Sequence, residues 1–170
     1  MLKNPTKPVI FAVYFLMVVL VTTLDRWSKA AVETGLALGQ SIHIGSLFYI
    51  TLVHNRGGAF GILQGQKLIF VIVGVLVIGA ILFYLYRTKN ISWWMLLGLG
   101  AISAGAVGNL YDRVTLGYVI DFIDVHVWDY VFNVADIAID VGFGAILIDM
   151  ILAERNKKSE ETSKSSDNKI

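Results

Sequence analysis

Residues 68–86, LIFVIVGVLVIGAILFYLY, decide the fold class of this chain. The stretch carries no charged side chain, and as a helix rising about 1.5 Å per residue it nearly spans the roughly 30 Å hydrocarbon core of a bilayer. The rest of the chain has a similar character, because 56% of its 170 residues are hydrophobic and only 16% are charged. The mean hydropathy is +0.67. The sequence therefore predicts a protein embedded in a membrane.

Three further apolar runs lie at residues 8–24, 93–110 and 134–152. The first run follows Lys3 and Lys7 and could alternatively be the apolar core of a cleaved signal peptide. It is longer than such cores usually are, and no small-x-small cleavage site follows it directly, so we expect an uncleaved first span. The sequence thus predicts an all-α membrane protein with four transmembrane helices.

Basic residues near the span ends predict the orientation of the helices. Four spans place both termini on one side, and the basic residues flanking that side are Lys3, Lys7, Arg87, Lys89, Arg155, Lys157 and Lys158. Because cytoplasmic flanks carry an excess of Lys and Arg, we expect both termini in the cytoplasm. The external loops also contain basic residues, so this prediction depends on their position near span ends and not on their number.

Two segments outside the spans have distinct compositions. Residues 42–53, IHIGSLFYITLV, are rich in β-branched and aromatic residues and too short and polar to cross a membrane. We therefore expect an external β region at about residues 40–63, which could act as a flap over a site. Residues 154–170 are charged, Ser-rich and free of aromatics, which predicts a disordered cytoplasmic tail. Residues 1–153 would then form a single polytopic domain.

Composition also excludes several classes of function. The formal net charge of +1 produces no field that would attract nucleic acid. Cysteine is absent, which removes disulfides, thiolate nucleophiles and Cys-bearing zinc sites. His43, His54 and His126 have no metal-ligand spacing such as HExxH. We therefore expect neither a metal nor a cofactor.

Polar residues at membrane depth indicate where a site should lie, because a charge at the bilayer centre costs about 2.5 to 3.5 kcal/mol. These residues gather in four segments at the predicted external ends of the spans: 25–29 (DRWSK), 55–60 (NRGGAF), 108–113 (GNLYDR) and 121–136. If the spans form a compact bundle, the four segments meet at one level near the outer leaflet. The sequence thus predicts a single polar pocket there.

Asp121 and Asp136 each lie among apolar residues in the last of these segments. Two facing carboxyl groups in such surroundings share one proton, which is the arrangement that peptide hydrolysis by an activated water requires. The alternative is a pair of helix-end carboxylates that cap backbone amides or pair with Arg113. Periodicity alone does not favour these two acids over the other aspartates, which include Asp112, Asp124, Asp129 and Asp140.

Five ordered motifs resemble those of the lipoprotein signal peptidases, also called type II signal peptidases. They are DRWSK at 25–29, NRGGAF at 55–60, AGAVGNLYDR at 104–113, VIDFI at 119–123 and FNVAD at 132–136. The resemblance covers about residues 8–153. Family members often have GGALGN where this chain has AGAVGN, and often a Ser or Thr where it has Ile137. Both departures leave the acids unchanged.

The resemblance implies an aspartic endopeptidase of the bacterial cytoplasmic membrane, with its site near the outer leaflet. Such enzymes cleave a prolipoprotein just before a diacylglyceryl-modified cysteine, and peptide antibiotics of the globomycin kind inhibit them. The catalytic residues would be Asp121 and Asp136. The residues that match substrate-contacting positions are Asn55, Gly105, Asn109, Arg113 and Asn133. Asp25 and Lys29 match supporting positions, membrane lipids would surround the chain, and we expect it to act as a monomer.

Several of these residues also have simpler interpretations. Asn109 and Arg113 lie four apart on one helix face and could serve in capping and in ion pairs with Asp112 or Asp25. Gly105 could merely allow close helix packing. Asp140 lies one helical turn beyond Asp136, and we treat it as a candidate supporting partner.

Three other classes of protein remain as alternatives. An intramembrane aspartyl protease of the presenilin kind usually carries a GxGD signature, which this chain lacks. A small transporter or channel would spread its acids along a path through the membrane, whereas here they collect at one predicted level. A scaffold would perform no chemistry. We expect a mobile loop at about residues 126–131, between the two acids.

Overall fold

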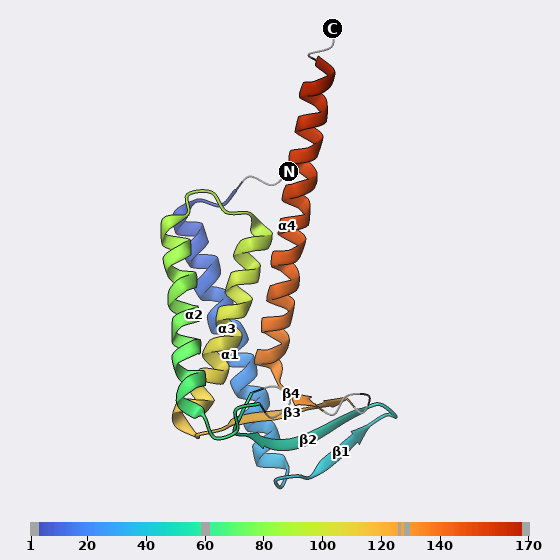
Figure 1. The fold of residues 1–170 in the computed structure, drawn as a ribbon. Helices are drawn as coiled ribbons and strands as arrows, with labels where there is room; N and C mark the ends of the chain where they lie inside the picture. Colours follow the sequence, from blue (N-terminus) through green and yellow to red (C-terminus); the bar gives the residue numbers. More distant parts are fainter. Residues whose placement is uncertain (1–3, 59–61, 126, 128–129, 168–170) are drawn as a thin grey trace.

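The computed structural model describes residues 4–58, 62–125, 127 and 130–167. Figure 1 shows a bundle of long helices with a small sheet at one end. The elements in chain order are α1 (Lys7–Gly35), β1 (Ser41–Ile44), β2 (Phe48–Asn55), α2 (Lys67–Arg87), α3 (Trp93–Thr115), β3 (Val119–Val125), β4 (Val131–Phe132) and α4 (Val134–Asp167). Both ends of the described chain lie away from the sheet (Figure 1).

Three of the four predicted spans correspond to helices that are long and apolar enough to cross a membrane. These are α1, α2 and α3. The fourth predicted span lies in α4, whose apolar part contains Asp136, Asp140 and Asp149. These acids keep α4 from meeting the same criterion of length and composition. The protein is thus mostly helical and has three candidate membrane helices, with a small antiparallel sheet.

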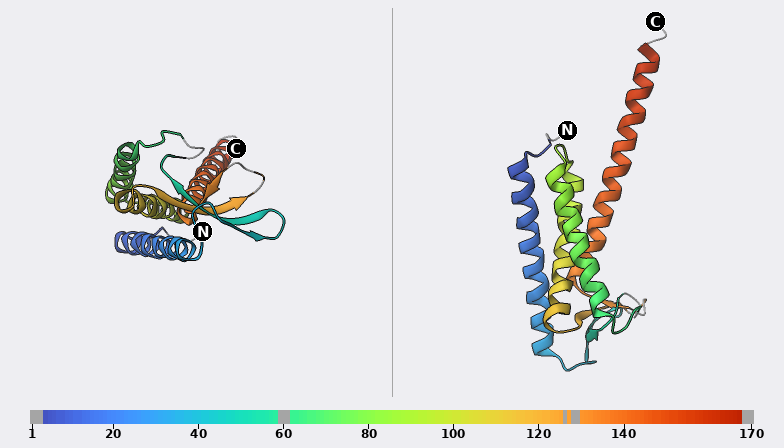
Figure 2. Two further views of the ribbon diagram at one scale, coloured as in Figure 1. Left: turned by 90° about the horizontal axis from the view of Figure 1, so that it is seen from below. Right: turned by 60° about the vertical axis from the view of Figure 1, so that its left-hand side comes forward.

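The end of α4 differs from the sequence prediction. Residues 154–170 were expected to be disordered, whereas α4 continues without interruption to Asp167 and rises beyond the other helices (Figures 1 and 2). Residues with good helix propensity follow Leu152, and Glu154 pairs with Lys158 one turn later at 2.7 Å.

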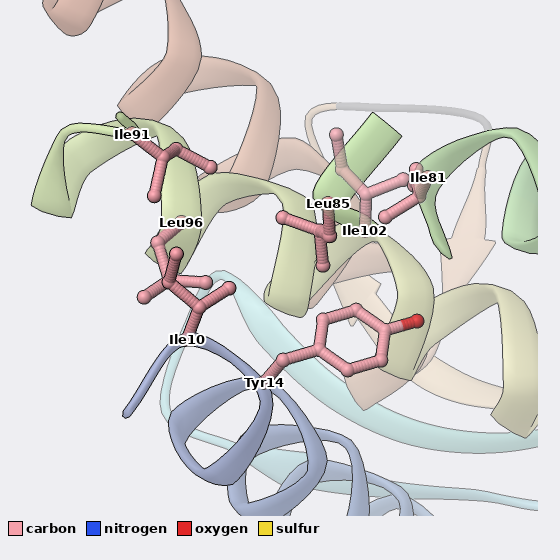
Figure 3. Packing of buried hydrophobic residues seen from close by; sticks show 7 residues of the cluster. All are labelled: Ile10, Tyr14, Ile81, Leu85, Ile91, Leu96 and Ile102. Carbon is pink, nitrogen blue, oxygen red and sulfur yellow. The ribbon is translucent and has the colours of Figure 1, made fainter. Parts of the chain in front are cut away.

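An apolar cluster joins α1, α2 and α3 toward the end of the bundle opposite the sheet. Its buried members, drawn in Figure 3, are Ile10, Tyr14, Ile81, Leu85, Ile91, Leu96 and Ile102. Lys7 strengthens the same end, because its Nζ donates to the backbone carbonyls of Leu85 and Tyr86 at 2.7 Å each. These carbonyls end α2, where a positive charge also favours the helix dipole.

Glycines allow α3 and α4 to pack closely. A Cβ on Gly98 would lie 2.8 Å from the carbonyl oxygen of Gly142, and a Cβ on Gly105 would lie 2.2 Å from that of Ala135. Small residues at such contacts let two backbones approach in a membrane. The contact at Gly105 brings the first turn of α4 against the part of α3 that contains Asn109.

The sheet has four antiparallel strands in the order β1-β2-β3-β4. The predicted β region at residues 40–63 contains β1 and β2, but the sequence did not predict β3 and β4. In β2 and β3, Val53 pairs with Asp121, and a register shift between Ile50 and Val53 marks a bulge. Seen from below in Figure 2, the sheet projects to one side of the bundle beneath α4. Asp121 therefore lies on a strand at the foot of the bundle.

Candidate active site

Asp121 lies on β3, and both oxygens of its buried carboxylate accept hydrogen bonds. The residue is 2% exposed. Its Oδ2 accepts a hydrogen bond from Asn55 Nδ2 at 2.9 Å, and its Oδ1 accepts one from Asn133 Nδ2 at 2.6 Å. Asn55 ends β2 and pairs with Val119, so it projects to the same sheet face as Asp121. The strand register thus determines which amide reaches this acid.

Asp136 lies in the first turn of α4, three residues after Asn133. Its Oδ1 accepts from Asn109 Nδ2 at 2.7 Å, and its Oδ2 accepts from the backbone N–H of Asn133 at 3.2 Å. Asn133 Oδ1 in turn accepts from the backbone N–H of Asp136 at 3.0 Å. This reciprocal pair is a capping box with Asp in place of the usual Glu. The start of the helix therefore positions the acid.

Asn133 connects the two carboxylates. Its side chain is fully buried, and its Nδ2 donates to Asp121 while its backbone N–H donates to Asp136. The pKa of Asp121 is raised to about 7, first because burial disfavours the ionised form and then because the charge of Asp136 repels a second negative charge. The hydrogen bonds from Asn55 and Asn133 act in the opposite direction. The charge of Asp136 thus influences the titration of Asp121.

Arg113 lies one turn after Asn109 on α3 and borders the acids. Its Nη2 donates to the carbonyl oxygen of Gly57 at 3.1 Å, and its guanidinium stacks over the ring of Phe70 at 4.6 Å from the centroid. Its charge interacts with both Asp121 and Asp136. The guanidinium therefore connects the segment after β2 to the acids.

A buried ionic cluster supports the acids from the side of α1. Lys29 Nζ lies 2.8 Å from Asp25 Oδ2 and 2.9 Å from Asp112 Oδ2, and all three side chains have no exposed surface. Arg26 also pairs with Asp112. The cluster reaches the two acids through backbone groups next to them, because Asp25 Oδ1 accepts from Ala135 N at 3.0 Å and Asp112 Oδ2 accepts from Ile120 N at 3.3 Å.

The predicted supporting residues differ in how they contact the site. Asp25 binds the backbone N–H of Ala135, next to Asp136, and Lys29 Nζ donates to Asn109 Oδ1 at 3.3 Å. Gly105 contacts the backbone of Ala135, so its position matches the alternative of helix packing. Asp140 is exposed and makes no hydrogen bond or ion pair with the polar side chains of the site within the described part of α4.

Two residues near the acids were not among the sequence candidates. Asp112 was named among the other aspartates and as an ion-pair partner but was not selected as a site residue, and in the structure it joins Arg26, Lys29 and the backbone of β3. Asp112 follows Asn109 by three residues, about one helical turn, and this spacing could have indicated that the two side chains lie near each other. Tyr130 was included only in the predicted mobile loop at 126–131. Residues 126, 128 and 129 of that loop lie outside the described residues.

A cavity of about 250 Å³ opens beside the acids between α2, α3 and α4. Apolar side chains such as Phe70, Val73 and Phe143 line it, together with Asn109 and Arg113. A cavity with this lining can hold an apolar group next to polar contacts. Among the described residues, no group of three or more His, Asp or Glu side chains is placed to hold a metal ion.

The chain is similar to known proteins over most of its length. The family model described as signal peptidase II matches residues 17–152. A lipoprotein signal peptidase of Streptococcus thermophilus is 46% identical over 135 residues, which are 78% of this chain and 88% of the relative. One from Desulfitobacterium hafniense is 38% identical over 143 residues, 84% of this chain and 95% of the relative.

The fold has a solved counterpart. A structure described as that of a bacterial membrane enzyme superposes with a TM-score of 0.83 at 28% sequence identity, covering 92% of this chain and 96% of the other. The family match includes both acids, the amides that bind them and the ionic cluster beside them. The resemblance of the five motifs is therefore confirmed, and the chain belongs to the signal peptidase II family.

Proposed function

We propose that this protein is a membrane aspartyl endopeptidase that removes the signal peptide from prolipoproteins. The bond hydrolysed is the peptide bond before the diacylglyceryl-modified cysteine. One observation carries the proposal: Asn133 binds Asp121 through its side chain and Asp136 through its backbone, which holds two carboxyl groups at one site. Membership of the signal peptidase II family supports the same reaction class.

The mechanism follows from two carboxyl groups that hold one proton between them. The ionised group takes a proton from a water molecule that attacks the scissile carbonyl carbon. The protonated group donates a hydrogen bond to the carbonyl oxygen and later passes a proton to the leaving amine. The raised pKa of Asp121 supports this state, because one acid keeps its proton near neutral pH. Which acid carries the proton is a property of the coupled pair.

The surroundings of the acids suit a substrate that is part lipid and part peptide. Asn109, which binds Asp136, and Arg113 line the apolar cavity between α2, α3 and α4, so we propose that this cavity holds an acyl chain near the acids. The sheet provides extended backbone next to Asp121, where the peptide would bind. We propose that α4 is the fourth span, that both termini are cytoplasmic, and that the sheet lies at the outer face of the bacterial cytoplasmic membrane.

The test measures cleavage of a lipidated prolipoprotein by the purified protein in detergent, with one carboxylate replaced in each variant. Asp121→Asn and Asp136→Asn should each lower kcat by about a thousandfold, because loss of a general acid or base typically costs 10² to 10⁴. Asp124→Asn is the matched control, since Asp124 lies on the same strand but accepts from Thr51 at 2.8 Å. Activity retained in either of the first two variants, with the control also active, would exclude the mechanism.

Two further measurements test the substrate and the inhibitor. Mass spectrometry of the cleaved product should show a lipidated cysteine at its new N-terminus, and cleavage at any other bond would contradict the proposal. A globomycin-type antibiotic should block the reaction at stoichiometric concentration. Sedimentation in detergent should give the mass of one chain, because every residue of the proposed site comes from a single protomer.

A further inference from the structure

Tyr130 lies immediately before β4 and shares the sheet face that carries Asp121. Its ring stacks on Phe132, with centroids 5.9 Å apart and an interplanar angle of 21°. Phe132 pairs with Ile123 across β3 and β4, and residues directly opposite in an antiparallel pair project to the same face. Asp121, two residues before Ile123, projects to that face as well. Stacking on Phe132 thus keeps the Tyr130 ring on the side of the acids.

Tyr130 interacts electrostatically with charged groups of the site. It interacts electrostatically with Asp136 and Asp140 of α4, with Asp121 of β3 and with Arg113 of α3. Arg113 in turn interacts with Asp121, Asp136 and Tyr130. These groups come from α3, α4 and β3 and include both acids, so Tyr130 lies within electrostatic range of the two carboxyl groups.

The surroundings of Tyr130 keep its phenol neutral. Burial raises the pKa of Tyr130, and the negative charges of Asp136 and Asp121 raise it further. The hydroxyl therefore carries its proton throughout the range in which the two acids can share one. A neutral phenol is a hydrogen-bond donor, and a fixed donor where negative charge develops stabilises the transition state of peptide hydrolysis.

We propose that Tyr130 is a further catalytic residue, whose hydroxyl donates a hydrogen bond to the scissile carbonyl oxygen as that oxygen becomes negatively charged. This inference rests on the proposed peptidase function. It adds a second donor to the protonated carboxyl group and forms no covalent bond.

The test is Tyr130→Phe, which keeps the ring on Phe132 and removes only the hydroxyl. With a lipidated prolipoprotein as substrate, kcat should fall at least about tenfold with little change in KM, because losing one oxyanion donor typically costs 10² to 10³. Tyr118→Phe is the matched control, since the Tyr118 hydroxyl bonds Glu33 at 3.4 Å on the surface. Its kcat should equal that of the wild type.

Each other outcome has a defined meaning. A Tyr130→Phe protein with wild-type kcat overturns the inference, and so does a loss confined to KM, which would indicate ground-state binding only. Tyr130→Ala removes the ring as well. If kcat falls in Tyr130→Ala but not in Tyr130→Phe, the residue acts through packing, and the inference is overturned. Rates are compared below the unfolding temperature of each variant. Asp121→Asn, measured in parallel, distinguishes failure of the Tyr130 inference from failure of the proposed peptidase function. Cleavage by Asp121→Asn would contradict the aspartyl mechanism itself.

Discussion

Asn133 and Asp136 cap each other, since each side chain accepts a hydrogen bond from the other's backbone N–H, at 3.0 and 3.2 Å. The start of α4 and the position of one proposed catalytic acid are therefore the same local structure. The amide of Asn133 has a second role, because its Nδ2 also binds Asp121. Two substitutions of Asn133 can separate its effect on the free energy of unfolding from its effect on kcat.

Asn133→Ser should keep the cap and lose the contact with Asp121, because a serine hydroxyl can accept at the N-cap but is too short to replace the amide. We expect a wild-type unfolding temperature with clearly reduced kcat. Asn133→Ala loses both interactions, so its unfolding temperature should fall as well, in line with about 1 kcal/mol for a lost cap. Thermal unfolding in detergent and steady-state kinetics measure the two effects. Equal unfolding temperatures in both variants would contradict the capping role.

The pKa of Asp121, raised to about 7, predicts the pH dependence of cleavage. The two acids need one shared proton, and Asp121 loses its proton as the pH rises through about 7, so kcat/KM should fall on the alkaline side of that value. The free energy of unfolding depends on pH in the same direction. The unfolded chain releases this proton near 3.8, so the group's contribution to the free energy of unfolding falls between 3.8 and about 7.

Asn55→Ala tests the cause of this pH dependence. The hydrogen bond from Asn55 lowers the pKa of Asp121 by favouring its ionised form. Removing it should raise that pKa and move the alkaline limb of the kcat/KM profile to higher pH, whatever happens to the maximal rate. A limb that stays in place or moves to lower pH would show that Asn55 does not act on the proton of Asp121.

Local sequence patterns predicted the helices and part of the sheet, whereas long-range contacts determined the rest. The uncharged run at 68–86 became α2 almost residue for residue, because hydropathy alone determines such a segment. The strand at Val119–Val125 was missed, since its partner β2 lies more than 60 residues earlier and only pairing makes it a strand. The five motifs predicted the two acids and their amides, and the structure brings these residues together. The partners of Asp112, Arg26 and Lys29, lie on α1 and are far from it in the sequence, so its spacing from Asn109 alone did not select it.

The buried ion pair of Asp25 and Lys29 should show strong coupling between the effects of the two substitutions on the free energy of unfolding. Neither side chain has exposed surface, and their charged atoms lie 2.8 Å apart. Removing one partner of a buried pair typically costs about 3 to 5 kcal/mol, because the other charge stays buried. Asp25→Asn and Lys29→Met should each lower the unfolding temperature markedly, and the double variant should lose less than the sum. Strict additivity in thermal unfolding would show that the pair contributes no mutual stabilisation.

Gly105→Ala should impair both stability and cleavage through the contact between α3 and α4. The added Cβ would lie 2.2 Å from the carbonyl oxygen of Ala135, so the helices must separate. Overpacking of this kind costs about 1 to 3 kcal/mol. It would also move Asn109 away from Asp136, whose hydrogen bond is 2.7 Å long. We therefore expect a lower unfolding temperature and a lower kcat.

Gly79→Ala is the matched control for that substitution. Gly79 also lies inside a membrane helix, but a Cβ there meets no atom within 4 Å. Alanine favours a helix over glycine by up to about 1 kcal/mol, so this variant should unfold at the same temperature as the wild type or slightly higher. Its kcat should be unchanged, because α2 contributes none of the side chains that bind the acids. If both variants behaved alike, the close approach of Gly105 to Ala135 would have no part in positioning Asp136.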